Sequence, residues 1–219
     1  MPDFALECRH LATGNYPVAG VDEAGRGSWA GPLYVAMVVF SPDTIADPPQ
    51  LISSINDSKQ LSPKKRELLF ETITSHASHW SYAAVSADII DTQGLTAATR
   101  IGIERCMRAF AKPIAMLLLD GKCSFGVKTP CECHPKADSL SYSVAAASIV
   151  AKVLRDREMC KLAREYPLYH FEIHKGYGTA LHREALMQHG PSPLHRQSYE
   201  PVRQSKLEKV LQMNTPQRL

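Results

Sequence analysis

The amino-acid sequence predicts an α/β fold, in which a central mixed β-sheet is flanked by helices and followed by a helical C-terminal part. Apolar runs with strand character alternate along the chain with segments that carry helical signals, which is typical of this fold class. The first two predicted strands, residues 18–23 and 33–40, are joined by a glycine-rich turn and should form a hairpin. The 219 residues, 44% of them hydrophobic, suffice for one good core. We expect one domain over residues 1–219, with its core at about 18–185 and its helical part at about 186–219.

Each element is predicted from a local signal. Residues 33–40 are rich in β-branched and aromatic side chains, as a strand requires, and residues 80–85 read as a third strand. Residues 114–119 form a short, continuous apolar run, typical of a buried strand. Ser62 followed by Pro63 is a strong helix start, because a hydroxyl caps the helix and proline suits its first position. The other predicted helices extend from Thr92 or Thr96 to Ala111, from Ser141 to about Glu165, and to about His189, and residues 41–49 read as a proline-rich loop.

Composition excludes two classes of protein. No run of 18 apolar residues is present to span a membrane, and the N-terminus lacks the basic start and long apolar centre of a secretory signal. We therefore expect a cytoplasmic protein, whose six cysteines are more simply explained as reduced thiols than as disulfides. Zinc held by Cys123, Cys131, Cys133 and His134 is the weaker alternative, because Cys-x-Cys is not the usual spacing of a zinc knuckle.

Charge is distributed unevenly along the chain. The net charge of +3 is too small to indicate a nucleic-acid-binding protein by itself. However, residues 1–50 contain two basic and six acidic residues, whereas residues 151–219 contain twelve basic and seven acidic residues. That asymmetry suits a metal site flanked by a phosphate-binding surface, and solvated helix faces would explain it about equally well.

The most informative stretch is residues 20–32, where Asp22 and Glu23 end an apolar run and a glycine turn follows. Adjacent strand residues point to opposite faces, so both carboxylates can serve one site only if the strand ends or twists, which Gly25 and Gly27 permit. Carboxylate oxygens are the ligands that Mg²⁺ and Mn²⁺ prefer. A phosphate-binding glycine loop is the competing interpretation, but without a metal these carboxylates would repel phosphate. A simple turn after a strand would explain the acidic dipeptide, but not the whole stretch.

Two further carboxylates lie at the ends of predicted elements. Asp120 follows a buried strand and precedes glycine, the usual place for a site residue in an open α/β sheet, although a turn aspartate would look the same. Asp138 precedes the long predicted helix and could simply cap it. Four converging acids would raise one another's pKa, and divalent metal would relieve this. We therefore predict that Asp22, Glu23, Asp120 and Asp138 are catalytic and bind two divalent ions, Mn²⁺ or Mg²⁺.

These motifs resemble one known family. The string Asp-Glu-Ala-Gly-Arg-Gly at 22–27, followed two residues later by Ala-Gly-Pro, closely resembles the first motif of ribonuclease HII. Ser28 and Trp29 replace the Pro-Leu or similar pair expected there, and Ala137 replaces a glycine before the last aspartate. The other strings that resemble the family are Asp-Ser-Lys-Gln-Leu-Ser at 57–62, Asp-Ser-Leu at 138–140 with residues 146–156, and residues 174–179 and 194–202.

The resemblance covers about residues 18–202 and implies a ribonuclease H-like fold. It also implies an endonuclease that hydrolyses the RNA strand of RNA–DNA hybrids and cuts on the 5′ side of ribonucleotides embedded in duplex DNA, leaving 3′-hydroxyl and 5′-phosphate ends. Such nucleic acids are the expected partners of a chain that we expect to be a monomer. The residues that would bind the substrate are Gly25, Arg26 and Gly27, whose backbone reads the 2′-hydroxyl, Tyr177, which stacks on the following deoxyribose, and Lys59, Lys152 and Arg196, which contact phosphates.

Two other interpretations compete with this one. Ribonuclease HIII, a related enzyme, carries a sizeable extra N-terminal domain and lacks arginine in the glycine turn. Here only about twenty residues precede the first strand, and Arg26 is present. A non-catalytic hybrid-binding protein on the same fold would be marked by a missing carboxylate, whereas all four are present. The sequence therefore favours the ribonuclease HII interpretation.

Overall fold

In the computed structural model, strands from both halves of the chain form one five-stranded sheet in the order β3-β2-β1-β4-β5. The structure describes residues 2–50, 52, 55 and 61–206. The strands are β1 (Val18–Ala24), β2 (Leu33–Val39), β3 (His79–Val85), β4 (Met116–Asp120) and β5 (Cys131–His134). The helices are α1 (Ala5–Ala12), α2 (Pro42–Ala46), α3 (Pro63–His76), α4 (Ala87–Arg108), α5 (Tyr142–Glu165), α6 (Phe171–His174) and α7 (Ala180–His189), with 3₁₀ turns η3 (Ala137–Ser139) and η4 (Pro167–Tyr169) and a further helical segment at 200–206. None of the described helices has the length and apolar character needed to cross a membrane.

Strand β1 lies at the centre of the sheet and gives it its mixed character. It pairs antiparallel with β2, which pairs antiparallel with β3. On its other side β1 pairs parallel with β4, which pairs parallel with β5. The predicted hairpin and the predicted mixed sheet are confirmed. Because β1 and β4 are parallel neighbours, their carboxyl ends lie at the same edge of the sheet.

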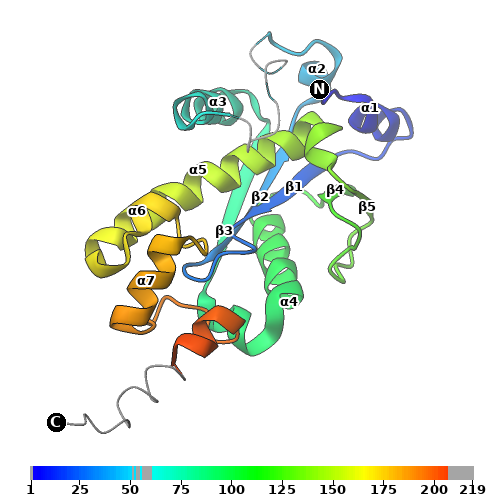
Figure 1. Cartoon of the computed structure of the whole chain (residues 1–219). Helices are drawn as coiled ribbons and strands as arrows, with labels where there is room; N and C mark the ends of the chain where they lie inside the picture. Colours follow the sequence, from blue (N-terminus) through cyan, green and yellow to red (C-terminus); the bar gives the residue numbers. More distant parts are fainter. Residues whose placement is uncertain (1, 51, 53–54, 56–60, 207–219) are drawn as a thin grey trace, which may run out of the picture.

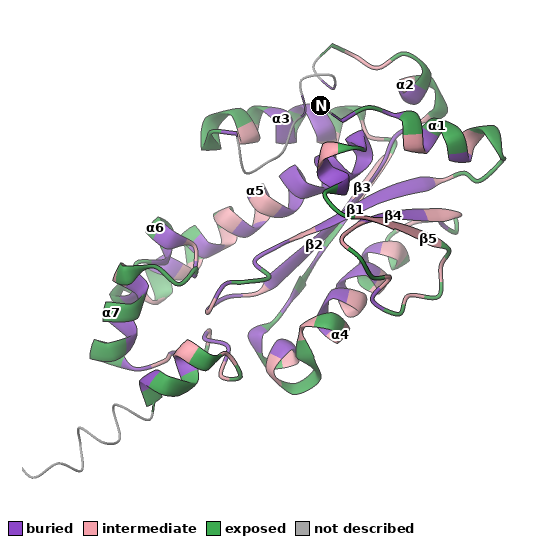
Figure 2. Ribbon diagram, turned by 45° about the vertical axis from the view of Figure 1, so that its right-hand side comes forward, coloured by how far each residue is buried: buried purple, intermediate pink, exposed green. Residues whose placement is uncertain are grey.

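Helices cover both faces of this sheet. Helix α5 lies across one face and α4 across the other (Figure 1). The buried side chains accordingly form two main clusters, one between the sheet and α5 together with α3, and the other between the sheet and α4. Figure 2 colours the ribbon by burial, and buried residues fill most of β1, β2 and the first half of α5. At Gly20 a Cβ atom would lie 2.1 Å from the carbonyl carbon of Ser143, so glycine lets the start of α5 pack directly on β1.

Helix α1 fixes the start of α5 by hydrogen bonds. Glu7 is fully buried, and its Oε1 accepts bonds from the Ser141 hydroxyl at 2.5 Å and from the Ser143 amide at 3.0 Å. Ser141 in turn caps α5 by accepting a bond from the Val144 amide. A carboxylate at the N-terminus of a helix is favoured by the helix dipole. The N-terminal segment therefore helps to hold α5 in place over the sheet.

Several boundaries differ from the sequence prediction. Helix α4 begins after Ser86, whose hydroxyl caps it, and not at Thr92 or Thr96. Thr92 lies inside the helix, and Gly94 interrupts the helix with a φ of 81°. Within the predicted proline-rich loop, Ser41 caps the five-residue helix α2. The sequence prediction also lacks α1 and β5, because both are short and neither has a strong periodic pattern.

Candidate active site

Two of the predicted carboxylates lie on adjacent strands at their carboxyl ends. Strand β4 ends at Asp120, and the parallel register pairs Leu119 with Val21, so Asp22 and Asp120 occupy the next position on each strand. Glu23 follows on β1, beyond the last residue that pairs with β4. The register of β1 and β4 thus brings these acids to one edge of the sheet, which is where open α/β sheets bind their ligands.

Asp22 is the most enclosed of these three acids. Its Oδ1 accepts a hydrogen bond from the Glu23 amide at 2.8 Å, and the Ser148 side chain on α5 also bonds to the carboxylate. Burial raises the pKa of Asp22 well above its usual range, and the charges of Glu23 and Asp120 raise it further, whereas the two hydrogen bonds lower it. A cation near this carboxylate would relieve the repulsion.

A short segment connects Asp138, the fourth predicted acid, to Asp120. The Ala137 amide donates a hydrogen bond to Oδ1 of Asp120 at 2.8 Å, and Asp138 follows in η3 with 5% of its surface exposed. The cap of α5 is Ser141, which accepts a bond from the Val144 amide, so the alternative role of Asp138 as the cap is wrong. The backbone bond keeps the Asp138 segment beside the end of β4.

The acids fit divalent metal by donor type and by charge. Carboxylate oxygens are what Mg²⁺ and Mn²⁺ prefer, and the repulsion that raises the pKa of Asp22 favours a cation. Asp22 and Asp120 each use one oxygen to accept a backbone amide. Within residues 2–50, 52, 55 and 61–206, no three His, Cys, Asp or Glu side chains are arranged to hold one ion as they stand. Cys123, Cys131, Cys133 and His134, which are all described, likewise form no group arranged to hold zinc.

The glycine turn lies against α5 and leaves part of its backbone open. Gly25 has a φ of +91°, and a Cβ atom there would lie 2.0 Å from Nε of Arg155, so the position requires glycine. A Cβ atom at Gly27 would meet no described atom within 4 Å, which leaves the backbone accessible to a ligand. Arg26 reaches back to Glu23, with 3.4 Å between Nη1 and Oε1. The turn therefore places open backbone and one cation beside the carboxylates.

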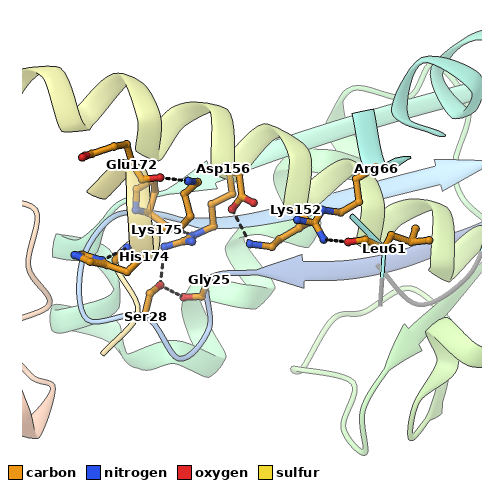
Figure 3. A network of polar contacts seen from close by, with 12 residues as sticks. Gly25, Ser28, Leu61, Arg66, Lys152, Asp156, Glu172, His174 and Lys175 are labelled. Atoms are coloured by element: carbon orange, nitrogen blue, oxygen red, sulfur yellow. Dashed lines mark hydrogen bonds and ion pairs between the residues drawn. The ribbon is translucent and has the colours of Figure 1, made fainter. Parts of the chain in front are cut away.

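Arg155 on α5 holds this turn from the inside. It is fully buried, and its Nη2 donates to the Ser28 hydroxyl at 2.7 Å and to the Ala30 carbonyl at 3.2 Å. Its Nε donates to the Pro32 carbonyl at 3.1 Å. Ser28 itself donates to the Gly25 carbonyl at 2.7 Å (Figure 3). Burial lowers the pKa of Arg155 to about 10, so the guanidinium stays charged at neutral pH. The sequence interpretation missed this residue, although an arginine on the apolar face of a helix is a usable signal.

Arg196 supports the same turn from the C-terminal part of the chain. It is fully buried, its Nε and Nη2 donate to the Gly31 carbonyl at 3.2 and 3.1 Å, and its Nη1 donates to the Arg26 carbonyl at 2.9 Å. The prediction that Arg196 contacts phosphate is wrong, because a guanidinium enclosed by protein carbonyls cannot reach one. Lys59, the other predicted phosphate contact before α3, lies outside the described residues.

The loop that carries Tyr177 is hydrogen-bonded to the glycine turn. The Gly176 carbonyl accepts bonds from the amides of Trp29 at 2.8 Å and Ala30 at 3.3 Å. Tyr177 is 36% exposed, and the centre of its ring lies 5.7 Å from Nζ of Lys152 on α5. The ring is therefore not folded into the core, and its accessible part lies beside a cation.

Both departures from the family pattern in the turn have a packing role. Ser28 is buried and supplies the hydroxyl that Arg155 binds. Trp29 packs on the Tyr177 loop, since a Cβ atom at Gly178 would lie 2.1 Å from the indole ring. Both departures therefore affect how the turn packs.

A cleft of about 570 Å³ lies between α3 and α5, with Lys152 in its wall. Nζ of Lys152 donates to Oδ1 of Asp156 at 2.7 Å (Figure 3). Cations outnumber carboxylates in the wall of the cleft, which suits the phosphate backbone of a nucleic acid. The charged residues of the wall are Arg66, Lys152, Arg157, Lys161, Arg164 and Lys175, with Glu67 and Asp156.

Known proteins resemble this chain over most of its length. Residues 19–202 match the family model described as Ribonuclease HII. A protein named Ribonuclease HII from Chloroflexus aurantiacus is 43% identical over 202 residues, which are 92% of this chain and 95% of that protein. The crystal structure of the ribonuclease H2 from Pyrococcus horikoshii OT3 matches with a TM-score of 0.71 at 28% identity, over 87% of this chain and 97% of that one. A structure described as Bst-RNase HIII in complex with Mn²⁺ matches with a TM-score of 0.70 at 21% identity, over 87% and 69% of the two chains, which is a likeness of fold alone.

Proposed function

The chain belongs to the ribonuclease HII family and is an endoribonuclease of the ribonuclease H type, and on this premise we propose that it cuts two kinds of substrate. One is the RNA strand of an RNA–DNA hybrid. The other is duplex DNA with an embedded ribonucleotide, cut on the 5′ side of that ribonucleotide. In each case a water oxygen bonds to phosphorus as the bond to the 3′ oxygen breaks, which leaves 3′-hydroxyl and 5′-phosphate ends.

The observation that carries this proposal is the position of acids at the carboxyl ends of two parallel strands. Asp22 and Asp120 are oriented by backbone amides, and the charges of Asp120 and Glu23 raise the pKa of Asp22. Together with Asp138 they would hold two divalent ions, Mn²⁺ or Mg²⁺. Such ions, when bound, supply Lewis acidity to the attacking water and to the leaving oxygen.

Recognition of the ribonucleotide is assigned to the glycine turn. The backbone of Gly25, Arg26 and Gly27 would bond to the 2′-hydroxyl, which is the group that distinguishes RNA from DNA. Arg155 and Arg196 support this role, because their bonds to turn carbonyls hold the backbone in one conformation. A pre-ordered backbone does not lose conformational freedom when the substrate binds.

The experiment that tests the function uses an end-labelled DNA duplex with one ribonucleotide, incubated with Mn²⁺ or Mg²⁺. We expect one cut, with a labelled product that ends in a 3′-hydroxyl immediately before the ribonucleotide. An all-DNA duplex and a chelated reaction are the controls, and both should stay uncut. A protein that binds the hybrid equally well in chelator and never cleaves it would instead be a non-catalytic hybrid-binding protein. Arg26 and the match to the ribonuclease HII model speak against the ribonuclease HIII alternative.

Tyr177→Ala is expected to lower kcat/KM at a single embedded ribonucleotide by about tenfold or more, which is about 1.4 kcal/mol. The ring lies partly exposed beside Lys152, where it can stack on the deoxyribose that follows the ribonucleotide. The loss should be smaller on an all-RNA strand paired with DNA, where no such junction exists.

The measurement compares both substrates for Tyr177→Ala and Tyr177→Phe. Phe keeps the ring and loses the hydroxyl, so it should cost less if stacking matters most. An equal and small loss on both substrates would show that Tyr177 only shapes the loop.

Lys152→Ala is expected to weaken binding at any sequence and to reduce the salt dependence of the binding constant by about one counterion. The reason is that its ammonium group lines the basic cleft beside the Tyr177 ring. Binding is measured in chelator between low and moderate salt. Lys112→Ala, which changes an exposed lysine in the segment between α4 and β4, is the control. An unchanged salt slope for Lys152→Ala would make this lysine an ordinary surface charge.

A further inference from the structure

Three histidines lie buried together behind the Tyr177 loop, and the proposed chemistry uses none of them. They are His174 on α6, His182 on α7 and His195 after α7, each less than 10% exposed. The rings of His174 and His182 stack with centres 4.4 Å apart, and those of His182 and His195 lie 5.2 Å apart. Buried polar rings persist only where their nitrogens find partners, so each hydrogen bond in this cluster has to be assigned.

The bonds of His182 and His195 fix the position of the ring proton on each of these two histidines. Nδ1 of His182 lies 3.0 Å from the Tyr177 carbonyl, which can only accept, so Nδ1 carries a proton. In the neutral ring Nε2 of His182 is then an acceptor, and it lies 3.0 Å from Nε2 of His195, which must donate. Nδ1 of His195 is thus left as an acceptor, and the Ser192 amide donates to it at 3.0 Å. One continuous chain of bonds leads from Ser192 to Tyr177.

This chain of hydrogen bonds ends at Tyr177, the residue assigned to substrate binding. The Tyr177 carbonyl accepts two hydrogen bonds, one from the Thr179 amide at 2.8 Å and one from His182. We propose that His195 and His182 are positioning residues, which act as a neutral two-histidine chain to hold the Tyr177 backbone so that the ring meets the deoxyribose. The proposal rests on the function proposed above for Tyr177.

The surroundings keep both rings uncharged at neutral pH. Burial lowers the pKa of His182 to about 4 and of His195 to about 3, and neighbouring histidines lower both further. The ionisable groups that face the pair are His174 from α6, Tyr169 from η4, and Arg183 from α7 across the Trp29 ring. In the described part of the chain, no carboxylate forms an ion pair with either ring. A second proton on His182 would lie on its Nε2, facing the proton on Nε2 of His195. Two donors cannot bond to each other, so the chain of hydrogen bonds would break at this point.

The lowered pKa values predict in which direction the free energy of unfolding changes with pH. Unfolded histidine has a pKa of about 6.5, so between that value and about 4 the unfolded state binds protons that folded His182 does not. The free energy of unfolding should therefore fall as the pH decreases through this window. His182→Gln should reduce that slope, because glutamine does not titrate. An unchanged slope would mean that the folded ring is not held neutral.

The decisive variants are His182→Asn and His182→Gln, which separate the two bonds of one ring. The amide nitrogen of asparagine falls near Nδ1 and can still donate to the Tyr177 carbonyl, whereas the end of glutamine falls near Nε2 and can pair only with His195. We expect His182→Gln to lower kcat/KM at an embedded ribonucleotide by about fivefold or more, and His182→Asn to cost clearly less. His170→Asn is the control, because that histidine is exposed and its left-handed backbone suits asparagine.

A double-mutant cycle with Tyr177→Ala shows whether His182 acts through the tyrosine ring. If it does, His182→Gln adds no further loss of kcat/KM once the ring is removed. A full additional loss in the Tyr177→Ala background would overturn the proposal, as would equal losses for His182→Asn and His182→Gln at equal thermal stability. These outcomes leave the proposed function intact. If Tyr177→Ala itself costs nothing, the roles of both the tyrosine and the histidines fail, and if the unmodified protein does not cut, the proposed function fails.

Discussion

Asp22→Asn is expected to lower kcat/KM by at least about a thousandfold, or about 4 kcal/mol, and at the same time to stabilise the metal-free protein. Cleavage is lost because the most enclosed acid of the proposed site no longer carries a charge. Stability rises because burial, Glu23 and Asp120 raise the pKa of Asp22. When a folded acid has a raised pKa, its full contribution to stability is present below the unfolded pKa of about 3.9 and is lost as pH rises through the folded pKa. Asparagine keeps the shape without that loss.

The measurement is thermal unfolding in chelator, together with cleavage in Mn²⁺. At pH 7 Asp22→Asn should melt above the unmodified protein, and the difference should shrink toward pH 4. Added Mn²⁺ should raise the melting temperature of the unmodified protein more than that of the variant. Asp43→Asn in α2, an exposed aspartate away from the sheet edge, is the control. Retained cleavage, or a variant that melts lower at pH 7, would contradict the proposed site.

The other three acids provide independent tests of the same site. Glu23→Gln and Asp120→Asn should each abolish cleavage and leave the fold intact. Asp138→Asn should be severe but less complete, because water can partly replace a fourth ligand. Near-normal cleavage by Asp120→Asn would refute the shared metal site.

Arg155→Met should destabilise the protein by about 3 kcal/mol or more, because it leaves buried acceptors without a donor. These acceptors are the carbonyls of Ala30 and Pro32 and the Ser28 hydroxyl. For a chain of this size the melting temperature should fall by roughly 6–12 °C. Activity should fall by about tenfold or more even well below that temperature, because the glycine turn loses the side chain that orders it.

Arg157→Met is the matched control for stability on the same helix; it is not a control for cleavage, because Arg157 also lines the basic cleft. Arg157 is exposed and pairs with Glu67 at the surface, so its loss should cost less than about 1 kcal/mol. Unfolding of both variants is followed by circular dichroism, and cleavage by Arg155→Met is compared with that of the unmodified protein at a temperature where both are folded. If the two variants lose equal stability, or Arg155→Met cleaves normally, Arg155 does not order the turn.

Most of the fold could be predicted from local signals. The strand at 33–40, the apolar run at 114–119 and the cap at Ser62 each carry their signal within a few consecutive residues. Helix α1 and strand β5 have no such signal. Strand β5 is a four-residue edge strand that depends on pairing with β4, and α1 is held by the buried bonds of Glu7. Short elements of this kind are stabilised by contacts with distant parts of the chain, and sequence patterns do not report those.

The candidate site divides in the same way. Asp22 and Asp120 could be selected because each ends an apolar run, and the turn and Tyr177 were identified through the family resemblance. Arg196 could not be assigned correctly, and Arg155 was marked only by its place on the apolar face of α5, because a charged side chain is expected at the surface unless partners enclose it. Their partners are turn carbonyls, and those of Arg196 lie up to 170 residues away in the sequence.

The sequence by itself determined most of the strands and helices, the mixed type of the sheet, and the oxygen-rich chemistry of the residues that follow its strands. Only the tertiary structure decided that the register of β1 and β4 sets Asp22 beside Asp120, that Arg196 is a buried support, and that two histidines connect Ser192 to Tyr177. The physical reason is the range of the interactions. Caps and periodic apolar faces act between residues a few positions apart, whereas strand register, burial and the direction of a proton in a hydrogen-bond chain depend on partners that only folding brings into contact.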